Sequence, residues 1–133
     1  MYGNTFGVLE SAYAALVTSG TATLETALFE VPQVVCYKVP VSWAARIIKN
    51  LFIKVKYVSL VNLISFSEVV PELLGSDMNA ENVHDHLIPL LSDTIERCMQ
   101  MDGYEQMKSL LGPAGAPDRA ARKIVDLLSA KSC

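Results

Sequence analysis

Apolar runs and amphipathic segments alternate in the first half of the chain, whereas amphipathic segments alone fill the second half. This pattern predicts a helix at 5–12, a strand at 15–18, a helix at 21–29 and a strand at 33–37. Strand, helix and strand in succession form a right-handed crossover with parallel strands. The near-continuous apolar character of 33–37 is typical of a strand buried on both faces of a sheet.

The remaining elements follow from the same pattern. They are a helix at 42–52, a third strand at 57–60, a short helix at 68–74, a helix at 80–91 kinked at Pro89, and helices at 94–111 and 119–130, the last two separated by a breaker loop at 112–117. Asn4, Asn79 and Asp118 are candidate N-caps. Because only three strands are evident, we expect an α/β fold with a partial Rossmann-like parallel sheet, flanking helices and a helical carboxyl-terminal half. We expect it to be incomplete at its amino end.

The junction between the first strand and its helix is a candidate phosphate site. Ser19, Gly20, Thr21 and Ala22 carry small side chains at the start of the helix, where the first amide N–H groups attract anions. Glu25 follows Thr21 by four residues, about 6 Å along the helix axis, which suits a ribose diol beside the phosphates. The alternative is an ordinary N-cap with an exposed glutamate, although Ala22 stands where a capping box needs Ser or Thr.

Asn62 is a second candidate contact, because it would follow the third strand at the sheet edge where open α/β folds bind ligands. An asparagine that caps a turn is the alternative. The Gly-x-Gly-x-x-Gly and Walker A patterns are both absent from the sequence.

Composition narrows the class of protein. The 133 residues are 51% hydrophobic with a net charge of −3, which fits one folded domain, and 14 acidic residues against 11 basic ones argue against a general nucleic-acid binder. Three widely spaced cysteines, Cys36, Cys98 and Cys133, fit free thiols in a reducing cytoplasm. His84 and His86 point to different sides of a helix, so the sequence predicts no metal site and no cofactor. It predicts neither a signal peptide nor a transmembrane helix.

Three motifs, in order, resemble lipid-A-disaccharide synthase: the residues 19–25 (SGTATLE), 31–38 (VPQVVCYK) and 54–64 (KVKYVSLVNLI). The resemblance continues through 68–74 and 115–121, and so covers nearly the whole chain. That family is similar to other inverting glycosyltransferases of the GT-B type with two Rossmann-like domains. The chain resembles most of the carboxyl-terminal donor domain, over 1–133, with 118–130 as a terminal helix.

The resemblance implies transfer of 2,3-diacylglucosamine from UDP-2,3-diacylglucosamine to 2,3-diacylglucosamine 1-phosphate, in a β-1,6 linkage and without a metal, during lipid A biosynthesis in Gram-negative bacteria. The resemblance implies that Ser19, Gly20, Thr21 and Ala22 face the diphosphate of the UDP-sugar. It also implies that Glu25 accepts hydrogen bonds from the ribose hydroxyls and that Asn62 lies near the UDP-sugar donor. The general base of the family belongs to the missing amino-terminal acceptor domain. We therefore expect no catalytic residue here and no turnover by this chain alone.

The sequence also departs from the family pattern. Val61 replaces a common proline, Phe66-Ser67 replaces a Gly-Arg pair, and Gly75 replaces a glutamine. Loss of that arginine removes a plausible phosphate partner.

The segment from Trp43 to Lys56 mixes apolar residues with Arg46 and Lys49, as in a helix that lies on an anionic membrane. The alternative is that its apolar residues pack on the sheet. The predicted location is the cytoplasm, peripherally on the inner membrane, with self-association through unpaired sheet edges. Two other functions stay open: another UDP-sugar glycosyltransferase, or a non-catalytic interaction or membrane-surface module that keeps the fold.

Overall fold

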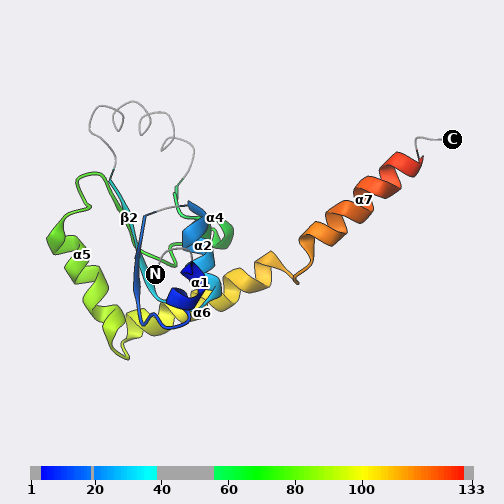
Figure 1. Ribbon diagram of the computed structural model, residues 1–133. Helices are drawn as coiled ribbons and strands as arrows, with labels where there is room; N and C mark the ends of the chain where they lie inside the picture. Colours follow the sequence, from blue (N-terminus) through cyan, green and yellow to red (C-terminus); the bar gives the residue numbers. More distant parts are fainter. Residues whose placement is uncertain (1–3, 19, 39–55, 131–133) are drawn as a thin grey trace.

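A computed structural model describes residues 4–18, 20–38 and 56–130, and its sheet has three parallel strands (Figure 1). The strands lie in the order β1 (Ala15–Val17), β2 (Gln33–Tyr37) and β3 (Glu72–Leu74). The helices are α1 (Thr5–Leu9), α2 (Gly20–Leu28), α4 (Leu60–Ser65), α5 (Ala80–Leu87), the 3₁₀ helix η1 (Ile88–Leu91), α6 (Ile95–Leu111) and α7 (Ala116–Ala130). The predicted α/β class with a parallel sheet is confirmed.

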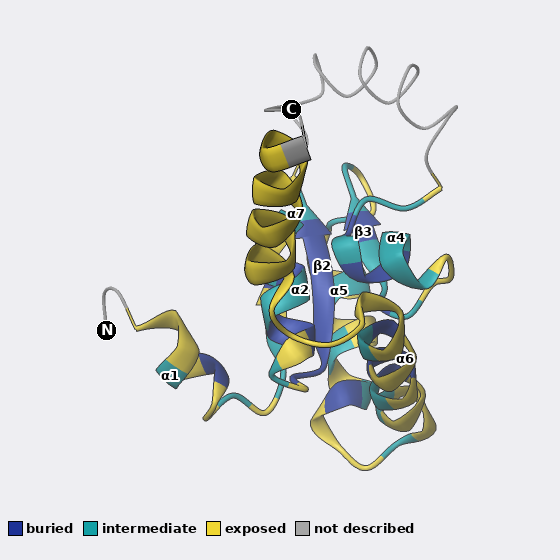
Figure 2. Cartoon of the chain, turned by 90° about the vertical axis from the view of Figure 1, so that its right-hand side faces the viewer, coloured by how far each residue is buried: buried dark blue, intermediate teal, exposed yellow. Residues whose placement is uncertain are grey.

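Two apolar clusters lie on opposite faces of β2. On one face, Val35 packs with residues of α2, α4 and α6, among them Ala27, Val61 and Met107. On the other face, Val34 and Cys36 pack with Leu73, Leu90 and the partly buried residues of α5. Consecutive strand residues point to opposite faces, so a strand buried on both sides must be apolar throughout. Figure 1 shows β2 between α5 on one side and α2 and α4 on the other, and Figure 2 shows β2 coloured as buried.

Capping residues fix several helix boundaries, and the predicted caps Asn4 and Asn79 are confirmed. The side chains of Asn4, Asn79 and Thr94 accept hydrogen bonds from the third residue beyond each cap, at the starts of α1, α5 and α6. The kink at Pro89 is confirmed, because α5 ends at Leu87 and the chain continues as η1. The first helix is shorter than predicted and ends at Leu9.

The predicted strand at 57–60 is wrong, because this stretch leads into α4. The Ser59 side chain accepts from the Asn62 amide and caps the helix, while the Val58 and Ser59 amides bind the Glu72 carboxylate instead of a neighbouring strand. The predicted helix at 68–74 is also wrong. Pro71 restricts the preceding residue to extended conformations. The Pro71 carbonyl oxygen accepts a hydrogen bond from the Val35 amide as the chain enters β3.

The terminal helix begins at Ala116, so the prediction that Asp118 caps it is wrong and Asp118 lies in its first turn. Pro117 is compatible with this earlier start, because proline fits the first turn of a helix. Figure 1 shows α7 projecting from the rest of the fold, and its apolar residues Ile124, Val125 and Leu127 are exposed. The predicted helix at 42–52 and nearly all of the candidate membrane segment lie outside the described residues.

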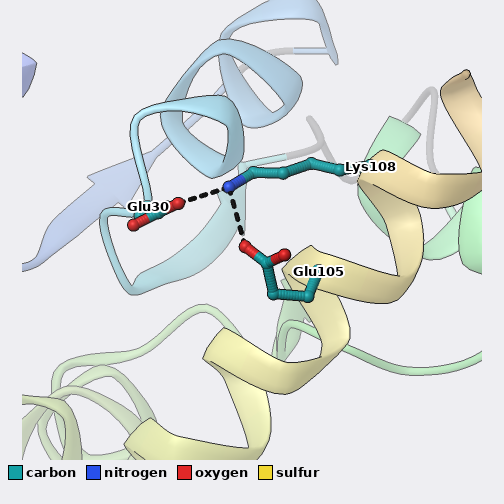
Figure 3. Close-up of polar contacts among 3 residues, drawn as sticks. All are labelled: Glu30, Glu105 and Lys108. Atoms are coloured by element: carbon teal, nitrogen blue, oxygen red, sulfur yellow. Dashed lines mark hydrogen bonds and ion pairs between the residues drawn. The ribbon is translucent and has the colours of Figure 1, made fainter. Parts of the chain in front are cut away.

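Lys108 ties α6 to the turn between α2 and β2. Its ammonium group donates to the Glu30 carboxylate and to Glu105, 3.1 Å away on the same helix (Figure 3). Glu30 has a positive φ of 58° at this turn. The contact with Glu30, together with Glu105, raises the pKa of Lys108.

Candidate nucleotide site

The described residues leave the start of α2 uncovered at the carboxyl edge of the sheet. β1 ends at Val17, Thr18 and Thr21 are exposed, and α2 begins at Gly20. A Cβ placed on Gly20 would meet nothing within 4 Å, so a ligand can approach the backbone closely there. The first amides of a helix lack carbonyl partners within it and carry the positive end of the dipole. Ser19 lies outside the described residues.

The threonine hydroxyls farther along α2 bond within the helix. Thr23 Oγ1 donates to the Gly20 carbonyl oxygen at 2.6 Å, and Thr26 Oγ1 donates to the Ala22 carbonyl oxygen at 2.7 Å. Both threonines are buried, so these bonds satisfy their hydroxyl donors. The exposed Thr21 hydroxyl has no hydrogen-bond partner in the described part of the chain, which leaves it available to a ligand.

Glu25 follows one turn after Thr21. Its side chain is half-buried, and within residues 4–18, 20–38 and 56–130 no hydrogen bond or ion pair engages its carboxylate. An ionised carboxylate accepts hydrogen bonds and cannot donate them, so its two oxygens could accept from a pair of ligand hydroxyls. Thr21 and Glu25 thus lie one turn apart on α2, and the predicted diphosphate and ribose contacts there remain a prediction.

The amino end of α4 differs, because a carboxylate of the protein already occupies it. Glu72 Oε2 accepts from the Val58 amide at 2.8 Å, and Oε1 accepts from the Ser59 amide at 2.9 Å. The Ser59 side chain then accepts from the Asn62 amide at 3.2 Å. α2 and α4 contact each other, and among the described residues no protein carboxylate binds the first amides of α2.

Asn62 does not follow a strand, so its predicted placement is wrong. It lies inside α4, is completely buried, and uses all four hydrogen-bonding positions of its side-chain amide. Its Oδ1 accepts from the Val69 and Val70 amides, and its Nδ2 donates to the Val70 carbonyl oxygen and to Glu72. In this arrangement the side chain holds a turn and has no donor or acceptor left for a ligand.

A buried polar cluster that the sequence pattern did not predict positions α2. Gln33 Nε2 donates to the Thr23 carbonyl oxygen at 2.9 Å and to the Tyr104 hydroxyl at 3.2 Å, which links α2, β2 and α6. Burial raises the pKa of Tyr104 far above its usual range, so its hydroxyl stays neutral. The Gln33 Oε1 atom is buried without a partner in the described residues.

The Gln100 side chain makes the hydrogen bonds to β2 that the backbone of a neighbouring strand would otherwise make. The Val35 amide pairs with the chain entering β3, and Gln33 presents its backbone to the same edge two residues earlier, where β3 does not reach. Gln100 Oε1 accepts from the Gln33 amide at 2.7 Å, and its Nε2 donates to the Gln33 carbonyl oxygen at 3.1 Å. An isolated glutamine inside an amphipathic helix gave no sequence signal for this role.

A groove of about 750 Å³ lies elsewhere, between α5, α6 and the turn that enters β3. Its lining includes Glu68, Asp85, His86, Glu96 and Asp102. His84 and His86 belong to no group of three or more metal-ligating side chains in the described residues. No helix of the described part is long and apolar enough to cross a membrane.

Cys36 and Cys98 are free thiols, buried and exposed respectively, and burial raises the pKa of Cys36. Cys133 lies outside the described residues.

Comparison with known proteins gives one consistent family. A family model described as lipid-A-disaccharide synthetase matches residues 1–124. A lipid-A-disaccharide synthase from Prochlorococcus marinus (strain MIT 9313) is 42% identical over 117 residues, covering 88% of this chain and 30% of the relative. Those from Anaeromyxobacter sp. (strain K) and Syntrophus aciditrophicus (strain SB) are 36% and 34% identical, covering 95% and 98% of this chain and 32% and 34% of themselves. The chain thus spans about a third of the length of these relatives.

Proposed function

The chain belongs to the lipid-A-disaccharide synthetase family, and we propose that it is the part of such an enzyme that binds the UDP-sugar donor. The reaction proposed for the whole enzyme transfers 2,3-diacylglucosamine from UDP-2,3-diacylglucosamine to 2,3-diacylglucosamine 1-phosphate in lipid A biosynthesis. The observation that carries the donor role is the amino end of α2, which the described residues leave uncovered, with a Glu25 carboxylate one turn along the helix that has no partner among those residues.

Each residue of the proposed site has one task. The backbone at Gly20, Thr21 and Ala22 binds the diphosphate, with the Ser19 and Thr21 hydroxyls as further donors. Glu25 accepts from the two ribose hydroxyls. A negatively charged diphosphate complements the positive end of α2, whereas the corresponding end of α4 is already neutralised by Glu72.

Turnover requires the part of the enzyme that holds the acceptor, and we propose that this chain alone is inactive. It spans about a third of its relatives' length. The acylated substrates place the proposed reaction at the cytoplasmic surface of the inner membrane. The outer edge of β1 is unpaired among the described residues and Leu16 is exposed there, which supports self-association of the isolated chain.

Titration of the isotope-labelled chain with UDP, and with CDP as a control, tests the donor role. We expect dispersed amide resonances and UDP-selective shifts confined to residues 19–25 and their neighbours. Dispersed resonances that shift with neither UDP nor CDP would show that this chain does not bind the donor nucleotide, and would favour a non-catalytic module. Equal responses to UDP and CDP would retain a phosphate site but reject selectivity for uracil.

A further inference from the structure

We propose that Asn62 and Glu72 are positioning residues of the nucleotide site, which hold α4 and thereby set the start of α2. The inference rests on the proposed function, because the site that they position is the nucleotide site. Neither side chain needs to touch the nucleotide.

The orientation of the Asn62 amide is fixed by its partners. Two backbone amides, those of Val69 and Val70, point at Oδ1 from 2.8 and 2.9 Å, which only an oxygen can accept. Two acceptors, the Val70 carbonyl oxygen and Glu72 Oε1, lie 2.8 Å from Nδ2. Asparagine is therefore the residue whose shape and donors match the site, and aspartate has the shape but lacks the donors.

Glu72 extends this arrangement to the start of α4. Its carboxylate receives three donors, the Val58 and Ser59 amides and the Asn62 side chain. Glu72 belongs to β3 and pairs in register with Val35 of the central strand. The Asn62–Glu72 pair therefore fixes α4 to the sheet through charge-assisted hydrogen bonds, which are stronger than neutral ones.

Packing transmits the position of α4 to α2. Val61 and Ile64 of α4 share one apolar cluster with Leu24 and Ala27 of α2. Protein cores are close-packed, so a shift of α4 displaces the helix that it contacts. The amides that receive a phosphate tolerate little displacement, since a change of about 1 Å in a functional geometry can reduce its effectiveness about a hundredfold.

A double-mutant cycle with Asn62→Asp and Glu72→Gln tests the inference. Asn62→Asp puts an acceptor against the Glu72 carboxylate and the Val70 carbonyl oxygen, and we expect the Kd for UDP to rise about tenfold. Glu72→Gln removes a charge and should raise the Kd about threefold. In the double variant a glutamine amide faces the new carboxylate, so we expect an increase below the product of the two single effects.

Two controls accompany the cycle. Asn79→Asp makes the same chemical change at an exposed N-cap on the other side of the sheet, where aspartate caps equally well, and should leave the Kd unchanged. Thermal unfolding of every variant is followed by circular dichroism, and UDP binding is measured well below each midpoint. A purely structural role would lower the midpoint and leave the Kd of the folded protein unchanged, which would overturn the inference.

The remaining outcomes are equally decisive. Independent effects of the two substitutions would overturn coupling between the residues. A loss of UDP-N-acetylglucosamine binding with unchanged UDP binding would show that Asn62 contacts the sugar instead. If Asn62→Asp does not fold, Glu72→Gln alone must still weaken UDP binding, and an unchanged Kd rejects the proposal.

If the unsubstituted chain ignores UDP, the proposed function fails while the positioning remains testable. The ligand-free amide resonances of residues 20–22 should then move in the Asn62→Asp variant and return toward their original positions in the double variant. If the amide resonances of residues 20–22 do not move in any variant, the positioning role of Asn62 and Glu72 is rejected.

Discussion

Glu25→Ala is the sharpest perturbation of the proposed site, because the carboxylate has no role in the fold of the described residues. It makes no hydrogen bond or ion pair there, so the free energy of unfolding should change by less than about 0.5 kcal/mol. A thermal midpoint close to that of the original chain would therefore separate loss of binding from loss of structure.

The expected loss of affinity follows from two hydrogen bonds between one carboxylate and the ribose hydroxyls. A hydrogen bond to a charged group contributes about 1.5–3 kcal/mol, and the half-exposed position of Glu25 favours the lower end for each. A total of about 2–3 kcal/mol raises the Kd for UDP about 30- to 150-fold. Isothermal titration calorimetry or the amide titration measures this change directly.

Binding of 2′-deoxy-UDP tests whether Glu25 accepts hydrogen bonds from the ribose hydroxyls. 2′-Deoxy-UDP removes one of the two donors, so the original chain should bind it about tenfold more weakly than UDP, and Glu25→Ala should bind both ligands alike. Glu68→Ala removes an exposed carboxylate next to the groove beside α6 and controls for the change in net charge. Equal discrimination between UDP and 2′-deoxy-UDP before and after Glu25→Ala would refute the assignment to the ribose.

Three further predictions concern the support of α2 and α6, and denaturant unfolding measures each. Gln100→Leu leaves a buried backbone amide and carbonyl beside β2 without partners and should destabilise the fold by about 2–4 kcal/mol; a loss under 1 kcal/mol would contradict this role. Gly103→Ala would make its Cβ overlap the Val69 side chain and should destabilise the fold by about 1–2 kcal/mol despite the better helix propensity of alanine. The folded state raises the pKa of Lys108 above 10.5, so the Lys108 ammonium group stabilises the fold below pH 10.5. This contribution to the free energy of unfolding should disappear as the pH rises through the folded-state pKa. Glu30→Gln removes the main cause of the shift and should reduce the pH dependence.

Local chemistry made the first half of the fold predictable from the sequence. The small residues Gly20 and Thr21 that begin α2, and the unbroken apolar run of β2, are short-range signals that agree with the structure. The N-caps Asn79 and Thr94 are equally local, since each side chain binds an amide three residues away. Asp118 fails as a predicted cap because Pro117 also fits a helical first turn, so the local signals there conflict.

Elements that depend on distant partners could not be predicted in the same way. β3 has only three residues and forms because its backbone pairs with β2, some 37 positions earlier in the register Val35↔Glu72. The aromatic and β-branched residues before α4 favour a strand. The Val58 and Ser59 amides, however, donate to the Glu72 carboxylate and not to the carbonyl oxygens of a neighbouring strand. Neither Pro71 nor Ser59 identifies its partner in the sequence.

The two helix ends show most clearly where sequence reasoning stops. α2 begins with Gly20 and Thr21, α4 is capped by Ser59, and either start could hold an anion on local chemistry alone. The distinction comes from Glu72, which reaches α4 from another element and supplies the negative charge internally. Because that charge is already in place, a ligand phosphate would be repelled at the start of α4. The spatial pairing of Glu72 with α4 therefore favours α2 as the phosphate site in the function that we propose.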